Sequence, residues 1–183
     1  MDSIQGSLSN NRLSKNEARQ VLRRIINFEI PVSDLINNLE SGNYWLLFNT
    51  FWILRDLSRE AKQIIFPYQQ QIYDCMIKNS TDEGVVRNGI SIFEDQEISE
   101  KLEDAIFDFC FEKLTNNSSA IAIKAFSMTV CYKIALKYPD LFSELKIVIE
   151  DNIDTLGQVS PAIISRGRKI LKLIDRHSNR WYP

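Results

Sequence analysis

The chain has 183 residues, with 22 Lys and Arg, 24 Asp and Glu, three Cys and one His, and its formal net charge is -2 at pH 7. A charge so close to zero excludes attraction of the whole molecule to nucleic acid or to an anionic membrane. A single histidine excludes most zinc, haem and histidine-based catalytic sites. Six glycines and five prolines are few for a turn-rich β fold, so the composition favours helices.

Hydrophobic residues recur at helical spacing along most of the chain, which predicts an all-α fold of about nine helices. Residues 1–13 are polar and are expected to be a disordered N-terminal lead-in. Ser14 and Glu17 form a capping box that starts the first helix. The helix expected over residues 43–58 is apolar on nearly every side, so it should lie between neighbours that cover it.

The following helix, expected over residues 59–79, contains Pro67 and should be kinked or broken near it. Ser80 and Glu83 form a second predicted capping box. Ser160 followed by a proline is the usual start of a helix and predicts the last one. We expect one domain over residues 14–177 and a C-terminal tail over 178–183.

Several side chains are predicted to pack in helix contacts. Gly89 and Gly167 lie inside expected helices, where each costs about 1 kcal/mol relative to alanine, so we expect close helix approach between repeats there. Phe109 and Leu145 fall on apolar helix faces and are expected to be buried. An acidic cluster around residue 100 is expected to be solvated surface; it consists of Glu94, Asp95, Glu97, Glu100, Glu103 and Asp104.

A repeat runs through the chain, because four helix starts can be superimposed on one another. In each copy a polar residue, usually a cation, follows apolar ones and is followed by a small residue and an apolar stretch. These polar positions are Asn49, Arg87, Lys124 and Arg166, at spacings of 38, 37 and 42 residues. One further helix lies between successive copies, which predicts stacked helical hairpins that bury their apolar faces against their neighbours.

The segment Asp82-Glu83-Gly84-Val85-Val86-Arg87 and the related Ile123-Lys124 and Ser165-Arg166 resemble the HEAT-like α-solenoid family. The resemblance implies a right-handed α-α superhelix of roughly four hairpins over about residues 31–174. It also implies that Arg87, Lys124 and Arg166 are cations of a ladder between neighbouring second helices. Asn49 breaks that pattern, so the first repeat should lack the ion pair. Residues 121–171 look like a group of small bacterial HEAT-like proteins without an established activity.

No GxGxxG, P-loop, HExxH, EF-hand loop or paired CxxC motif occurs. We therefore expect no catalytic residues, no cofactor and no metal. The three cysteines, Cys75, Cys110 and Cys131, each fall inside an apolar helical pattern and are expected to be buried in a reducing compartment, which indicates a cytoplasmic protein. No apolar stretch approaches the length that a membrane span needs.

Three functions remain open at this point. The first is a non-enzymatic scaffold that binds an unknown protein partner through the concave surface of the solenoid. The second is nucleic-acid binding through the basic C-terminal helix, as in the DNA alkylation-repair proteins of HEAT-like fold, and the third, least supported, is a hydrolase or lyase. The candidate interaction surface consists of the repeat positions expected to be exposed, which are Asn49, Arg87, Ser91, Lys124, Arg166 and Arg168.

Overall fold

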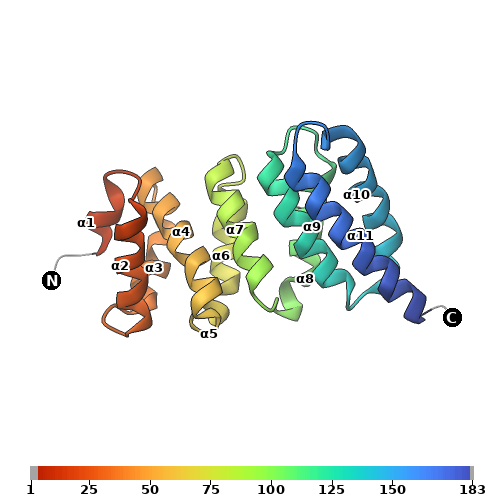
Figure 1. Cartoon of the computed structure of the whole chain (residues 1–183). Coiled ribbons are helices and arrows are strands. Elements are labelled where there is room, and N and C mark those ends of the chain that lie inside the picture. Colours follow the sequence, from red (N-terminus) through yellow and green to blue (C-terminus); the bar gives the residue numbers. More distant parts are fainter. Residues whose placement is uncertain (1–3, 182–183) are drawn as a thin grey trace. The chain divides into compact units, whose positions relative to one another are not determined.

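The computed structural model describes residues 4–181, and within that range it contains α-helices and short 3-10 helices but no strand (Figure 1). The all-α prediction is confirmed. The chain forms two compact units, Met1–Glu97 and Ile98–Pro183, where one domain was expected. Stacked hairpins contact only their neighbours, so each half of such a chain can hold a core of its own. The helices of unit 1 are α1 (Ile4–Ser9), α2 (Lys15–Ile26), α3 (Val32–Asn37), η1 (Asn38–Glu40), α4 (Tyr44–Glu60), α5 (Lys62–Ile65), η2 (Phe66–Tyr68), α6 (Gln69–Lys78) and α7 (Glu83–Asp95).

Unit 2 consists of two helical hairpins. Helix α8 packs against α9, α10 packs against α11, and α11 also packs against α9. Its last helix starts as the sequence predicts, since the backbone N–H of Ile163 donates to Ser160 Oγ over 3.4 Å. The helix continues through residues 178–181, where a tail was expected, and residues 182–183 lie outside the described part. The helices of unit 2 are α8 (Glu100–Thr115), α9 (Ile121–Ala135), η3 (Pro139–Leu141), α10 (Phe142–Leu156) and α11 (Pro161–Trp181).

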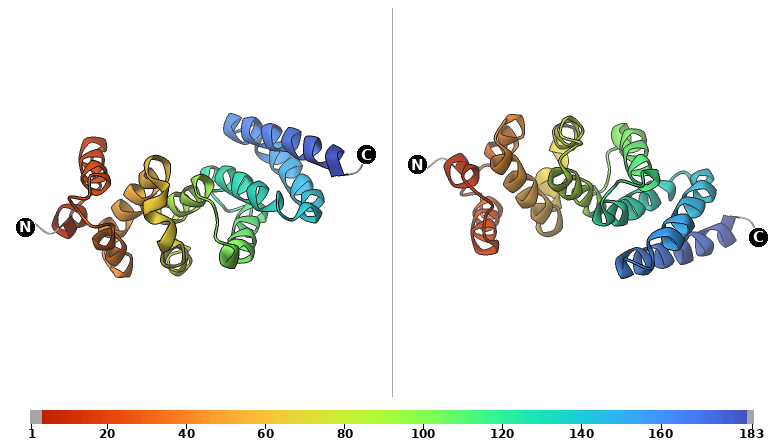
Figure 2. Two further views of the ribbon diagram at one scale, coloured as in Figure 1. Left: turned by 90° about the horizontal axis from the view of Figure 1, so that it is seen from below. Right: turned by 90° about the horizontal axis from the view of Figure 1, so that it is seen from above.

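Helix α4 is the central helix of unit 1. It packs against α1, α2, η1, α5 and α7, and Phe51, Ile53 and Leu54 are fully buried. Helices α3 and α6 lie on one side of the α4–α7 pair (Figure 2). The prediction that the helix over residues 43–58 is covered by neighbours is therefore confirmed.

The N-terminal segment differs from the disordered lead-in expected for residues 1–13. Residues 4–9 form α1, which packs against α4, and Leu8 and Leu13 are buried. Ser14 then caps α2, since Ser14 Oγ accepts from the Glu17 backbone N–H at 3.3 Å and Glu17 Oε2 accepts from the Ser14 backbone N–H at 2.7 Å. This capping box agrees with the prediction. Of the residues expected to be disordered, 1–3 lie outside the described part of the chain.

The helix expected over residues 59–79 is interrupted at its proline. Pro67 lies in η2, which separates α5 from α6, as predicted. The boundary between the helices expected over residues 43–58 and 59–79 lies at Ala61, which separates α4 from α5. The predicted capping box at Ser80 is wrong, because α7 begins after Asp82, whose Oδ1 accepts from the backbone N–H groups of Gly84 and Val85 at 2.8 and 3.1 Å.

The two helix glycines lie at close helix contacts. A Cβ atom on Gly89 would lie 2.5 Å from Met76 Sδ, and one on Gly167 would lie 2.8 Å from Ile153 Cδ1. Both of these neighbours belong to the first helix of the same hairpin. The close approach is therefore confirmed, but its tightest contacts lie within hairpins and not between repeats.

The core of unit 2 contains one expected residue and one unexpected one. Leu145 is fully buried, as predicted. Phe109 is only partly buried, and Lys113 Nζ lies 4.9 Å from the centre of its ring. Phe107 is the aromatic residue of α8 that is buried instead, so the buried face of α8 is rotated from the expected one.

Phe28 has a left-handed backbone, with φ at 60°, and its side chain is 84% exposed. It closes α2, because the N–H of Phe28 donates to Ile25 O and that of Glu29 donates to Arg24 O, at 3.0 and 2.9 Å. Glycine is the residue that ordinarily occupies this position of a helix end.

We expect Phe28→Gly to raise the free energy of unfolding by about 1 kcal/mol, because glycine adopts this conformation without the steric cost of a Cβ atom. Urea denaturation followed by circular dichroism measures the difference. Phe28→Ala keeps the Cβ atom and should leave the midpoint unchanged. Equal midpoints for the glycine variant and the wild type would contradict the assignment of strain to this backbone.

Candidate functional site

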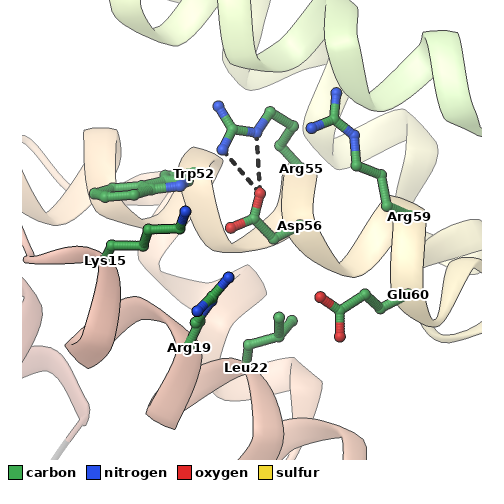
Figure 3. Close-up of a pocket in the computed structure, with 8 residues that line it drawn as sticks. All are labelled: Lys15, Arg19, Leu22, Trp52, Arg55, Asp56, Arg59 and Glu60. Carbon is green, nitrogen blue, oxygen red and sulfur yellow. Dashed lines mark hydrogen bonds and ion pairs between the residues drawn. The ribbon is translucent and has the colours of Figure 1, made fainter.

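A cleft of about 320 Å³ lies in unit 1 between α2 and α4. Figure 3 shows it with side chains from both helices directed into one space. We call it the α2–α4 cleft. It is lined by Lys15, Arg19, Leu22, Trp52, Arg55, Asp56, Arg59 and Glu60.

The two arginines of α4 are held in place by neighbouring side chains. Arg55 donates from Nε and Nη2 to Asp56 Oδ1 at 3.1 and 2.8 Å, and from Nη1 to Asn88 Oδ1 at 3.0 Å. Arg59 forms an ion pair with Asp95 Oδ2 at 2.8 Å and donates to Ser91 Oγ at 3.0 Å. These bonds join α4 to α7, so they fix one wall of the cleft.

The two cations that α2 contributes to the cleft make no such contacts within the described part of the chain. Lys15 and Arg19 are both exposed, and they lie four residues apart and so on one face of the helix. Neither makes a hydrogen bond or an ion pair with any residue that the structure describes. In Figure 3 their charged ends point toward the same space as the carboxylate of Asp56. Two cations at the cleft are therefore available to a ligand.

An aromatic side chain forms one end of the cleft. Trp52 is partly exposed, and the guanidinium carbon of Arg12 lies 5.4 Å from the centre of its ring. The same carbon lies 5.7 Å from the centre of the Phe48 ring. Arg12 therefore adds a further cation beside the cleft, held by the faces of two aromatic rings.

The lining of the cleft favours an anion. Its lining has two more cations than carboxylates, and it includes no Ser, Thr, Cys or His side chain. Guanidinium and ammonium groups bind carboxylates and phosphates through charge-assisted hydrogen bonds. Across the described residues, no group of three or more His, Cys, Asp or Glu side chains is placed to hold a metal ion.

Three of the predicted interaction residues are buried, so their assignment to an exposed surface is wrong. Asn49 is 0% exposed and binds the N-terminal segment: its Nδ2 donates to Leu8 O at 2.9 Å and to Asn11 O at 2.7 Å. Its Oδ1 accepts from the Leu13 N–H at 3.1 Å. Ser91 is also fully buried and accepts from Arg59. These side chains satisfy buried polar groups and cannot meet a partner.

Lys124 is the third buried residue of the set, with 2% of its surface exposed. Its Nζ donates to Leu114 O at 2.6 Å, and Asn152 Nδ2 donates to the same oxygen at 3.1 Å. Burial lowers the pKa of Lys124 below its usual value. Leu114 lies in the last turn of α8, where carbonyl groups lack helical partners, so Lys124 acts as a cap for that helix end.

The ladder expected from the family resemblance has different members. Arg87 is partly buried and makes no hydrogen bond or ion pair with any residue described in unit 1. Arg166 donates to Thr129 Oγ1 at 2.9 Å and lies over the Phe126 ring, 5.2 Å from its centre. Among the described side chains, neither Arg87 nor Lys124 forms an ion pair with a carboxylate.

The contacts between second helices that the sequence reasoning missed are those of Arg55 and Arg59 with α7. Their spacing of four residues places both side chains on one face of α4, and this could have indicated a shared polar partner. The acidic cluster is likewise only partly surface: Asp95 pairs with Arg59, and Glu103 is buried.

The last predicted residue, Arg168, is exposed as expected and lies on α11. Lys172 and Arg176 follow it at intervals of four residues and are exposed too. These three form one cationic stripe along α11, separate from the α2–α4 cleft, which belongs to unit 1.

Comparison with known proteins gives one result. A model of the HEAT repeat domain matches residues 4–174 of the chain. No curated protein and no solved structure matches the chain. Among the described residues, none of the helices combines the length and the apolar character needed to span a bilayer.

Proposed function

Because the chain belongs to the HEAT repeat family, whose hairpin repeats generally form surfaces for other proteins, we propose that it is a non-enzymatic scaffold whose binding surface is the α2–α4 cleft. In this proposal the occupant is a segment of a partner protein that carries Asp or Glu side chains. The supporting observation is the pair Lys15 and Arg19, two exposed cations at a cleft with no partner among the described residues.

The carboxylates of the cleft restrict what it can accept. Asp56 is paired with Arg55, so Glu60 is the carboxylate of the lining that repels a ligand that is negative throughout, such as a polyphosphate. Lys15 and Arg19 attract an isolated carboxylate. Trp52 offers an apolar and aromatic wall next to the cations. A segment with a carboxylate beside an apolar side chain satisfies both parts of the cleft, because specificity requires repulsion of wrong partners as well as attraction of the right one.

The cysteines support a role without chemistry. Burial raises the pKa of Cys75 to about 11 and also raises the pKa of Cys131. Thiols with raised pKa values are protonated at neutral pH and are poor nucleophiles. All three cysteines are buried and free of disulfide bonds, which supports placing this function in the cytoplasm.

A displayed library of random peptides, selected on the full chain, tests the proposal. We expect the selected peptides to be enriched in Asp and Glu. A fluorescein-labelled peptide from the selection should bind Lys15→Glu/Arg19→Glu at least about tenfold more weakly, which corresponds to about 1.4 kcal/mol. The affinity for the wild type should also fall as salt is added, because exposed charges are screened.

Arg23→Glu/Arg24→Glu is the matched control, since both residues are exposed cations on α2 that do not line the cleft and the net charge changes equally. It should leave the affinity within twofold of wild type. Selected peptides without acidic residues, or equal loss in the control, would contradict the proposal. Salt-sensitive binding of duplex DNA that Arg168→Glu/Lys172→Glu abolishes would instead favour nucleic-acid binding through α11.

A further inference from the structure

A second groove lies in unit 2, between α8, the end of α9, η3 and the first turn of α10. It has a volume of about 650 Å³ and an aromatic lining. The rings of Phe107 and Phe111 are stacked, with centres 5.6 Å apart and planes at 16°. Tyr138 also lines the groove and is 44% exposed. Aromatic side chains in a groove of this kind serve as anchoring points for a partner.

Four carboxylates line the same groove. Asp104 and Asp108 come from α8, and Asp140 and Glu144 come from η3 and the first turn of α10. All four are exposed, and no cation in the described part of unit 2 forms an ion pair or hydrogen bond with any of them. The groove is therefore acidic, in contrast to the α2–α4 cleft.

Lys137, a cation adjacent in sequence to the groove, is paired with a buried carboxylate. Lys137 forms an ion pair with Glu103, which is 1% exposed and also accepts from the Tyr138 hydroxyl at 2.9 Å. These contacts raise the pKa values of Lys137 and Tyr138 above their usual values. The charge of Lys137 is thus balanced by Glu103, and Glu103 holds Tyr138 at the groove.

Helix stability does not account for the two carboxylates that α8 contributes to the groove. Like charges four residues apart on a helix repel each other, so Asp104 and Asp108 destabilise α8. Glu144 differs, because a carboxylate in the first turn of α10 interacts favourably with the helix dipole. The pair on α8 therefore carries a cost in stability that a cationic ligand would remove.

We propose that this groove binds a segment of a partner protein that presents arginine or lysine side chains. A guanidinium group pairs with carboxylates and also lies favourably over aromatic faces, and the groove offers both. The occupant is opposite in charge to that of the α2–α4 cleft, so the two surfaces take different segments and this inference does not depend on the function proposed for the cleft.

Fluorescence anisotropy with a short fluorescein-labelled peptide of alternating arginine and leucine tests the inference on the full chain. The triple variant Asp104→Asn/Asp108→Asn/Asp140→Asn should bind this peptide at least about tenfold more weakly than wild type. The control variant Glu150→Gln/Asp151→Asn/Asp154→Asn changes the net charge equally, on exposed residues of α10 outside the groove. It should bind within twofold of wild type.

Phe111→Ala tests the aromatic lining and should also weaken binding of the peptide. Lys15→Glu/Arg19→Glu should leave its affinity unchanged. Circular dichroism confirms that each variant is folded. Absence of binding by the wild type, or equal loss in both triple variants, would overturn the inference. Self-association of the wild type that the groove variant abolishes would overturn it too, because the occupant would then be a second copy of this chain.

Discussion

Replacing Phe51 by alanine is expected to lower the free energy of unfolding by about 3–5 kcal/mol. Phe51 is 0% exposed and lies in the middle of α4, the helix against which α1, α2, η1, α5 and α7 pack. Its ring lies against the backbone of Gly89 on α7, where an added Cβ atom would come within 3.3 Å of Phe51 Cε1. Truncation leaves a cavity that a close-packed helix pair cannot fill by relaxing.

Urea denaturation of the full chain measures this loss. The fluorescence of Trp45 and Trp52, which lie on α4 like Phe51, reports the unfolding of unit 1. Phe28→Ala is the matched control, because it removes the same side chain from an 84% exposed position. The control should unfold at the same urea concentration as the wild type. A loss below about 1 kcal/mol for Phe51→Ala would show that α4 is not the centre of the core.

Asn49→Leu is expected to lower the free energy of unfolding by about 3 kcal/mol, or to detach the N-terminal segment from α4. The substitution keeps the size of a buried side chain but removes the partners of two carbonyl groups and one N–H group, at Leu8, Asn11 and Leu13. Backbone groups buried without a partner are unfavourable, so the segment should open to water. Hydrogen exchange at the Leu13 amide detects this opening directly.

Thr50→Val is the control for this prediction. Thr50 is the next residue on α4 and is equally buried, but its hydroxyl has no hydrogen-bond partner in the described structure. Removing an unpaired buried hydroxyl should leave stability unchanged or raise it slightly. If both variants behaved alike, the loss in Asn49→Leu would come from packing and not from its hydrogen bonds.

The helices and their order were predictable because they rest on local patterns. The capping box at Ser14, the break at Pro67 and the start after Ser160 each depend on residues a few positions apart, and the structure contains all three. The wrong cap at Ser80 shows the limit of such patterns, since Asp82 competes for the same helix start and an aspartate is an equally good cap.

The candidate site was harder to predict, because the same polar residue can serve a surface or an interior. Asn49, Ser91 and Lys124 stand at repeat positions, and sequence alone did not show that their partners were a folded N-terminus, Arg59 and the end of α8. Those partners lie between 10 and 41 residues away along the chain. The cleft itself combines residues of α2 with residues of α4, and no repeat pattern links them.

The folded N-terminal segment affects how deletions of this protein should be interpreted. Leu8 fills part of the interior beside α4, and Arg12 lies over Trp52 at the end of the cleft. Trimming the chain back to Ser14 would therefore remove a piece of the core and reshape the neighbouring surface at once. A shortened protein that no longer captures its partner would not show that the missing residues touch that partner.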